Sequence, residues 1–220
     1  QGCMTEMDVK RIRAGNFARN NGQVLQGVNI LRIKFNKLAG IERVVKSSGM
    51  APDEFLESVN FLAEEGYIRL RYISTKETAT LADAEYTALE AKLTGKGIRL
   101  RAGGIEDDMV EVSSSDKSLL RAGNFVQNNG GVLRPLNILS HKYNKLGNLQ
   151  SLLYGEGVAE DEFLDSVNFL ASEGYIHLRL IATREPALLA DHEYTELEAK
   201  LTSRGKRLLK GGIEDNMIEV

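Results

Sequence analysis

The chain has 220 residues, of which 42% are hydrophobic and 27% are charged, and its formal net charge is −3. The sequence contains no apolar run long enough to cross a membrane and opens with no charged-then-apolar leader, so we expect a cytoplasmic protein without membrane contact. Cys3 is the only cysteine, which excludes an internal disulfide and a cysteine-cluster metal site.

Residues 13–112 and 121–220 are two copies of one sequence. At a constant offset of 108 positions, 62 of the 100 residues are identical. A repeat of this length fits a whole small domain and not a solenoid unit. We therefore expect two homologous domains, over residues 4–112 and 121–220, with a linker over residues 113–120. Copy 1 has 14 Lys/Arg against 14 Asp/Glu and copy 2 has 11 against 14, so any nucleic-acid binding would depend on a local patch.

The first part of each copy is predicted to be helical. In copy 1 a helix is expected over residues 4–20, ended by the Asn-Asn-Gly sequence at 20–22. A second helix is expected over residues 29–38, and Ala39 and Gly40 separate it from a short helix over residues 41–45.

A third helix and two strands give the clearest pattern. After a turn at residues 49–51, helical spacing of Phe55, Val59 and Leu62 predicts a helix over residues 52–65, which Gly66 ends. Residues 67–73 and 89–94 alternate apolar and polar side chains, which indicates two half-buried strands joined by a long connection. A short helix is expected from Thr94 to the glycines at 103–104, followed by a tail over residues 105–112.

This order of elements resembles the winged helix-turn-helix family. The stretch from Gly49 through FLESVNFLAEEGYIRLR is similar to the turn, third helix and first wing strand of that family, and Gly174-Tyr175-Ile176 repeats the junction in copy 2. The ending KLTGKGIRLRAGGIED is similar to the final strand and helix of small winged-helix proteins of bacteria and prophages.

The resemblance implies a mainly α fold with small β hairpins (α+β), built as two winged helix-turn-helix domains in tandem by internal duplication. It also implies a function: a DNA-associated bacterial or prophage transcriptional regulator that acts as a pseudo-dimer on double-stranded DNA.

Serine, lysine and carboxylate residues are plentiful, but the sequence shows no arrangement of a nucleophile with a base. The three histidines, His141, His177 and His192, occur only in copy 2 and lack metal-ligand spacing. The glycines around Lys96 do not have the spacing of a phosphate-binding loop. We therefore expect no enzymatic activity, no cofactor and no metal ion.

The predicted third helix has an acidic exposed face, which is unusual for a helix that reads a DNA groove. Residues 52–66 contain five carboxylates and no Lys or Arg, and residues 160–174 repeat this composition. Carboxylates near phosphates oppose the attraction that supplies most nucleic-acid affinity. The alternative function is therefore a protein-interaction module that keeps the fold but does not read a DNA groove. A plain solvated helix face is the other interpretation of these acidic residues.

Basic residues are concentrated instead on the predicted wing and last helix of each copy. A contact with phosphates would use these cations, although scattered solubilising residues are the alternative interpretation. The candidates are Arg69, Arg71, Lys76, Lys96, Arg99, Arg101, Arg179, Arg184, Arg204, Lys206 and Arg207.

Phe61 and Phe169 fall on the acidic side of the predicted third helix, away from its buried stripe. Two explanations remain open at this point: the long hairpin folds back over each ring, or each ring makes a protein contact, either between the two modules or between chains.

Overall fold

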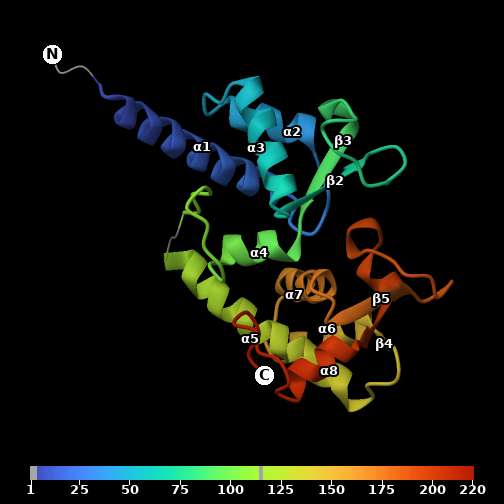
Figure 1. The fold of residues 1–220 in the computed structure, drawn as a ribbon. Helices are drawn as coiled ribbons and strands as arrows, with labels where there is room; N and C mark the ends of the chain where they lie inside the picture. The colour runs from blue at the N-terminus through green and yellow to red at the C-terminus, as the bar shows by residue number, and fades with distance from the viewer. Residues whose placement is uncertain (1–3, 114–115) are drawn as a thin grey trace. The chain divides into compact units, whose positions relative to one another are not determined.

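The structure, a computed structural model, describes residues 4–113 and 116–220 (Figure 1). Cys3 and positions 114 and 115 of the predicted linker lie outside the described residues. The chain divides into two compact units between Ser114 and Ser115. In its described part, each unit combines four α-helices with a three-stranded antiparallel sheet, so the fold is of the mixed α+β class.

Unit 1 begins with a long helix and ends with a short one. Its elements are α1 Glu6–Val28, β1 Asn36–Lys37, α2 Leu38–Lys46, α3 Pro52–Glu64, β2 Ile68–Tyr72, the 3-10 helix η1 Tyr86–Ala88, β3 Leu89–Leu93 and α4 Gly95–Ala102. A capping box begins α1, since the Thr5 hydroxyl accepts from the Asp8 N–H at 3.2 Å and the Asp8 carboxylate accepts from the Thr5 N–H at 3.0 Å. Proline at the first position starts α3.

Unit 2 repeats this order. Its elements are α5 Asp116–Ile138, β4 Asn144–Lys145, α6 Leu146–Gly155, α7 Glu160–Ser172, β5 Ile176–Leu180, the 3-10 helices η2 Leu189–Asp191 and η3 Tyr194–Glu196, β6 Leu197–Leu201 and α8 Ser203–Leu209. The predicted linker over residues 113–120 overlaps the start of α5, so most of it is helical.

The central strand of each sheet is the last one in sequence. In unit 1 the strand order is β1-β3-β2, with Ile68 opposite Leu93 and Asn36 opposite Ala91. In unit 2 the order is β4-β6-β5, with the equivalent register. The outer strand at Asn36–Lys37 was not predicted, because two residues are too few to show alternation.

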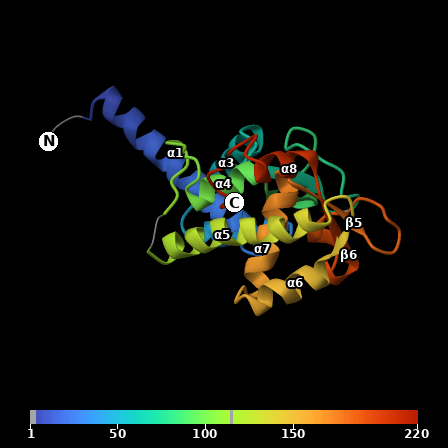
Figure 2. The same ribbon diagram turned by 90° about the horizontal axis from the view of Figure 1, so that it is seen from below.

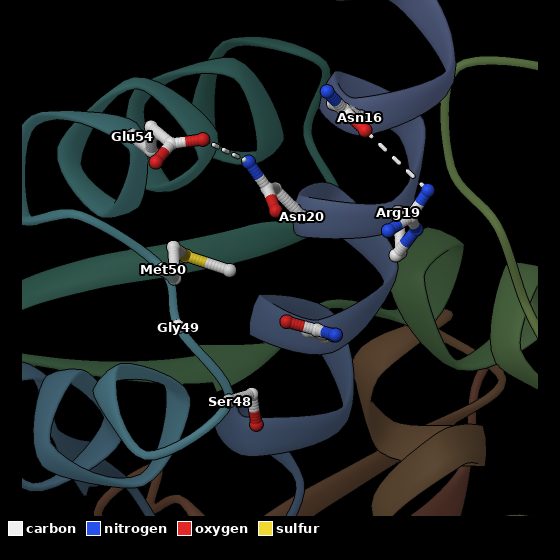
Figure 3. Close-up of a pocket in the computed structure, with 8 residues that line it drawn as sticks. Asn16, Arg19, Asn20, Ser48, Gly49, Met50 and Glu54 are labelled. Atoms are coloured by element: carbon white, nitrogen blue, oxygen red, sulfur yellow. Dashed lines mark hydrogen bonds between the residues drawn. The ribbon is translucent and has the colours of Figure 1, made fainter. Parts of the chain in front are cut away.

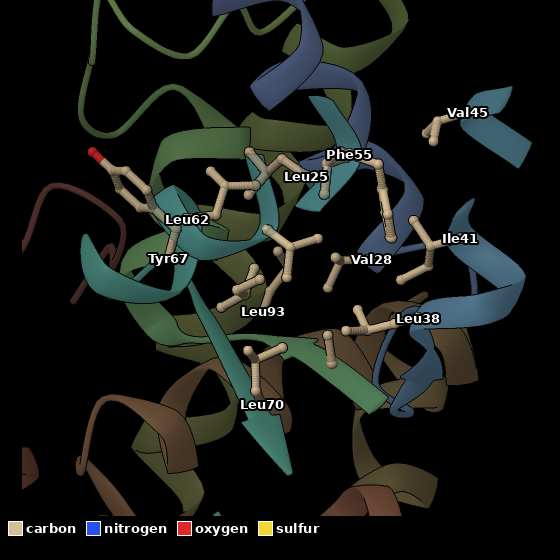
Figure 4. Close-up of a cluster of buried hydrophobic side chains, with 14 of the residues drawn as sticks. Leu25, Val28, Leu38, Ile41, Val45, Phe55, Leu62, Tyr67, Leu70 and Leu93 are labelled. Carbon is tan, nitrogen blue, oxygen red and sulfur yellow. The ribbon is translucent and has the colours of Figure 1, made fainter. Parts of the chain in front are cut away.

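The helices and the sheet of unit 1 enclose one apolar core (Figure 4). Leu25 and Val28 of α1 meet Phe55 and Leu62 of α3 there, and Leu38 of α2 closes the same cluster. Equivalent residues are buried in both units, namely Phe55 and Phe163, Val59 and Val167, Leu62 and Leu170, and Ile68 and Ile176.

The first helix is not broken at residues 20–22, and this prediction was wrong. Figures 1 and 2 show α3 against the C-terminal half of α1, while the N-terminal half of α1 extends beyond the other elements of its unit. Asn21 is fully buried, and its amide donates to the Met109 carbonyl at 2.9 Å. A Cβ at position 22 would overlap the carbonyl oxygen of Glu111. The helix-breaking residues therefore let the tail approach α1, and tertiary contacts outweigh their low helix propensity.

The helix predicted over residues 29–38 is also absent. Residues 29–33 form consecutive turns, and α2 begins only at Leu38 and continues through Ala39 and Gly40. Asn36 prevents a helix here because its buried side chain donates to the Val28 carbonyl at 2.6 Å and accepts from the Leu31 N–H at 3.2 Å. Asparagine side chains that bond to nearby backbone groups compete with helical hydrogen bonding.

Candidate nucleic-acid interface

The exposed face of the third helix is acidic, as predicted. On α3, Asp53, Glu57 and Glu64 are exposed, and the helix contains no Lys or Arg. Glu54 is held in the structure, since its carboxylate accepts from the Ala51 N–H at 3.1 Å and from the Asn20 amide at 3.0 Å. This helix therefore offers negative charge, and not phosphate contacts, to an approaching nucleic acid.

The tip of the β2–β3 hairpin carries a basic residue in an unusual backbone conformation. Lys76 has φ of 62° and the equivalent Arg184 has φ of 63°, in the left-handed region that non-glycine residues rarely occupy. The turn is closed by the Lys76 N–H, which donates to the Tyr72 carbonyl at 2.9 Å, and Arg184 donates likewise to Leu180. Both side chains are exposed, so each hairpin presents a cation at its tip.

The two arginines on β2, in the hairpin of unit 1, have different environments. Arg69 is exposed, whereas Arg71 is only 4% exposed. The Arg71 guanidinium lies 2.7 Å from the Glu90 carboxylate and 3.4 Å from the centre of the Phe35 ring. Arg71 is therefore a structural residue and is removed from the candidate phosphate contacts.

Unit 2 repeats this ion pair, although the Arg179 side chain is 23% exposed. Arg179 pairs with Glu198 at 2.7 Å and stacks 3.4 Å from the centre of the Tyr143 ring. The residue equivalent to Arg69 is His177, whose Nδ1 lies 2.8 Å from the Tyr143 hydroxyl. Arg179 is thus also engaged within its own unit, which corrects its assignment as a candidate contact.

The last helix of each unit places one of its cations against the end of the third helix and the residue that precedes the first hairpin strand. The Lys96 ammonium donates to the Glu65 carbonyl at 2.7 Å and lies 4.6 Å from the centre of the Tyr67 ring. In unit 2, Arg204 lies 3.9 Å from the Glu173 carboxylate and 4.8 Å from the centre of the Tyr175 ring. These contacts reduce the charge that either residue can offer to a phosphate.

The remaining candidates of the last helices are more accessible. Arg101, Lys206 and Arg207 are exposed, and Arg99 is half-buried. Together with Arg69 and the hairpin-tip cations Lys76 and Arg184, they are the predicted candidates that remain accessible. This set is smaller than the sequence predicted, because burial and ion pairing could not be seen from residue types.

Phe61 and Phe169 each have an aromatic partner on the first helix of their own unit. The Phe61 ring meets the Phe17 ring edge to face, with centroids 5.0 Å apart, and Phe169 meets Phe125 at 5.2 Å. Neither sequence-based explanation included this contact, because the first helix was expected to end near residue 20 and its face toward the third helix was not assigned. A role for these rings between modules or chains stays a prediction.

A polar pocket of about 170 Å³, which sequence reasoning missed, lies between α1, the turn before α3 and the start of α3 (Figure 3). Asn16, Arg19 and Asn20 line it from α1, and Ser48 and Glu54 line it from the other side. Its lining residues come from two separate stretches of the sequence, residues 16–23 and 48–54, so no local motif indicates the pocket. The pocket is small and polar, unlike the larger apolar clefts that usually hold organic ligands.

Metal ligation and membrane insertion can be checked over the residues that the structure describes. No group of three or more His, Cys, Asp or Glu side chains able to hold a metal ion is found among the described residues. Over those same residues, no helix combines the length and the apolar character needed to span a membrane.

Of the predicted candidates, unit 1 therefore keeps accessible cations on the exposed strand position Arg69, at the hairpin tip and on the last helix, whereas unit 2 keeps them at the hairpin tip and on the last helix. Comparisons of the chain with protein-family models, with curated proteins and with solved structures found no match.

Proposed function

We propose that the protein is a DNA-associated transcriptional regulator, built as two winged-helix units in tandem, that contacts the phosphate backbone through its wings. The order of one strand, two helices and a hairpin after the first helix in each unit supports this fold assignment. The observation that carries the functional proposal is the left-handed, exposed cation at each hairpin tip, Lys76 and Arg184. A strained conformation retained in both units is typical of a functional position.

The proposed mode of binding is backbone contact without groove reading by the third helix. Phosphate contacts position a protein on a duplex and supply most of its salt-dependent affinity. Two like units on one chain raise the effective concentration of the second contact once the first has formed. In this mode the acidic face of α3 points away from the phosphates. Its negative charge disfavours binding of DNA through α3.

The test is a titration of labelled duplex DNA by fluorescence anisotropy at low salt, comparing the wild type with the double variant Lys76→Ala, Arg184→Ala. We expect the double variant to bind more weakly and the slope of log K against log salt to become shallower by about one per removed phosphate contact. The matched control is Arg13→Ala with Arg121→Ala, which removes one exposed cation from the first helix of each unit. Equal weakening by both pairs would show that only net charge matters.

The second candidate function is a protein-interaction module that keeps this fold. The acidic exposed face of α3 supports it, because this face opposes DNA and offers complementarity to a basic partner. Wild-type protein that shows no duplex affinity at low salt, where phosphate attraction is strongest, would favour this function over the regulator.

A further inference from the structure

Each unit exposes two adjacent aliphatic side chains at equivalent positions, where its first helix ends. Ile30 is 54% exposed and Leu31 56%, and the equivalent Ile138 and Leu139 are 81% and 47% exposed. Single exposed apolar residues are ordinary on protein surfaces. An adjacent pair that recurs at equivalent positions of both units is a more specific feature. We name Ile30 with Leu31, and Ile138 with Leu139, the aliphatic pairs.

The pair of unit 1 is held in place by a buried side chain. The side-chain oxygen Oδ1 of Asn36 accepts from the Leu31 N–H at 3.2 Å. The side-chain amide of Asn36 donates to the backbone carbonyls of Val28 at 2.6 Å and Lys34 at 3.2 Å. Arg32, next to the pair, has φ of 46°, so the turn also holds a residue in the left-handed region. The turn is therefore fixed by hydrogen bonds and presents its apolar residues without needing to be ordered on binding.

The turn of unit 2 has related bonds. The Lys142 N–H donates to the Leu139 carbonyl at 2.9 Å, as the Lys34 N–H donates to Leu31 at 3.0 Å in unit 1. The Asn144 amide donates to the Lys142 carbonyl at 3.4 Å. Both units thus display the aliphatic pair at the start of a hydrogen-bonded turn that leads into the outer strand of the sheet.

The charge that follows each pair is positive. Residues 29–38 contain three cations, Arg32, Lys34 and Lys37, and no carboxylate. Residues 137–146 contain Lys142 and Lys145 and again no carboxylate. An apolar anchor beside a cationic segment is complementary to apolar side chains flanked by carboxylates.

We propose that the aliphatic pairs are docking anchors for an acidic, amphipathic segment of a partner protein, with one segment bound by each unit. Nucleic acid fits these anchors less well, because its phosphates would use the cations and leave the aliphatic side chains in water. A second copy fits less well too, because a two-fold contact between equivalent turns would bring like charges together. A lipid surface fits less well too, because recognition of anionic lipids takes clusters of about 4–8 basic residues, and these segments carry three and two.

The probe is a fluorescein-labelled amphipathic peptide of leucine, alanine and glutamate, with its leucines at helical spacing, titrated with the full chain by fluorescence anisotropy. We expect two peptides to bind per chain. The fourfold serine variant carries the changes Ile30→Ser, Leu31→Ser, Ile138→Ser and Leu139→Ser. It should bind the peptide at least tenfold more weakly, which corresponds to about 1.4 kcal/mol. The pair of changes in unit 1 alone should reduce the stoichiometry to one.

The matched control is Val44→Ser with Leu152→Ser. These residues occupy equivalent positions on α2 and α6, and each is 49% exposed. This control should bind the peptide as the wild type does, and urea denaturation should show all variants folded. A peptide with lysine in place of glutamate should not bind, since its charge no longer complements that of the turns.

Three results would overturn the proposal: the glutamate peptide does not bind, the fourfold serine variant binds it as well as the wild type does, or the lysine peptide binds equally. Phosphatidylserine vesicles that bind the wild type but not the fourfold variant, without peptide binding, would assign the anchors to membranes instead. Self-association of the wild type that the serine changes abolish, measured by analytical ultracentrifugation, would assign them to a second copy. Duplex binding should be the same in the fourfold variant, so this proposal stands or falls separately from DNA contact.

Discussion

The hydroxyl of Tyr67 donates a 2.6 Å hydrogen bond to the carboxylate of Asp107, and Tyr175 makes the same bond to Asp215 at 2.5 Å in the second unit. Each bond joins the residue before the first hairpin strand, β2 or β5, to the tail that follows the last helix of its unit. The same carboxylates accept from the backbone N–H of Met109 and Met217 at 2.9 Å, so they also fix the bend of the tail. The tail then crosses the first helix, where the Glu111 N–H donates to the Ala18 carbonyl at 2.9 Å.

The tyrosine hydroxyls should make the stability of the protein fall at high pH. Burial, followed by the hydrogen bond and the charge of Asp107, raises the pKa of Tyr67 above its ordinary value of about 10, and burial and Asp215 raise the pKa of Tyr175. Because the folded state holds the phenolic proton more tightly, this stabilisation is complete below pH 10 and is lost as the pH rises above that value. Urea denaturation across this range should show a smaller loss in the variant Tyr67→Phe, Tyr175→Phe than in the wild type.

At neutral pH the same double variant should be destabilised by about 1–3 kcal/mol per lost hydrogen bond, because the tail carboxylates lose a partner. Tyr154→Phe, at an exposed position of α6, is the control and should change neither the stability nor its pH dependence. An identical pH dependence in the wild type and the double variant would contradict the assignment of this loss to the two tyrosines.

Gly22→Ala should destabilise the protein, whereas Gly15→Ala on the same helix should not. A Cβ at position 22 meets the Glu111 carbonyl, so the tail must move, and overpacking of this kind costs about 1–3 kcal/mol. A Cβ at position 15 has no neighbouring atom within 4 Å, and alanine there gains about 0.5–1 kcal/mol of helix stability. Opposite shifts of the melting temperature are expected, and equal shifts would contradict the tail contact.

Arg71→Met should destabilise the fold, and Arg69→Met should leave stability unchanged. Arg71 is buried against Glu90 and Phe35, and removal of one partner of a buried ion pair costs about 3–5 kcal/mol. Adding Glu90→Leu to Arg71→Met should recover part of the loss, because no uncompensated charge then remains near the sheet. The wild type, Arg71→Met, Glu90→Leu and the double variant form a double-mutant cycle. Calorimetry of these four proteins measures the coupling free energy between the two residues.

Removal of acid from the third helix should leave duplex binding unchanged or strengthen it. Glu57→Gln and Glu64→Gln each remove an exposed carboxylate of α3, and each such charge near a phosphate costs on the order of 1 kcal/mol. The measurement is the same anisotropy titration that tests the hairpin-tip cations Lys76 and Arg184. Weaker binding by these variants would mean that the face of α3 makes favourable contacts with the duplex, contrary to backbone contact by the wings.

Phe61→Ala and Phe169→Ala should both destabilise the protein, with the larger loss at Phe169. Phe169 is fully buried, and truncation of a buried phenylalanine costs about 3–5 kcal/mol. Phe61 is half-buried, so its loss should be smaller, at about 1.5–3 kcal/mol. Chemical denaturation measures both values, and an unchanged midpoint for Phe61→Ala would contradict the importance of its contact with Phe17.

The sequence alone predicted the elements in which local pattern and tertiary structure agree. Phe55, Val59 and Leu62 recur at helical spacing between Pro52 and Gly66, so periodicity, start signal and stop signal all indicated α3. The two hairpin strands were likewise predicted, because one face of the sheet is buried and the other is not, which produces alternation. The duplication was visible directly, since it is a property of the sequence.

The rest depended on contacts between residues far apart in the chain. From sequence alone, Asn21 and Gly22 indicate a helix break. Their contacts with Met109 and Glu111 of the tail show why the helix continues through them. Arg71 and Arg69 are the same residue type two positions apart, yet only the sheet decides that one is buried with Glu90 and the other is exposed. Local patterns report the preferences of neighbouring residues, whereas burial, ion pairing and close backbone approach follow from the tertiary structure, and these determine which cations and apolar residues remain available to a partner.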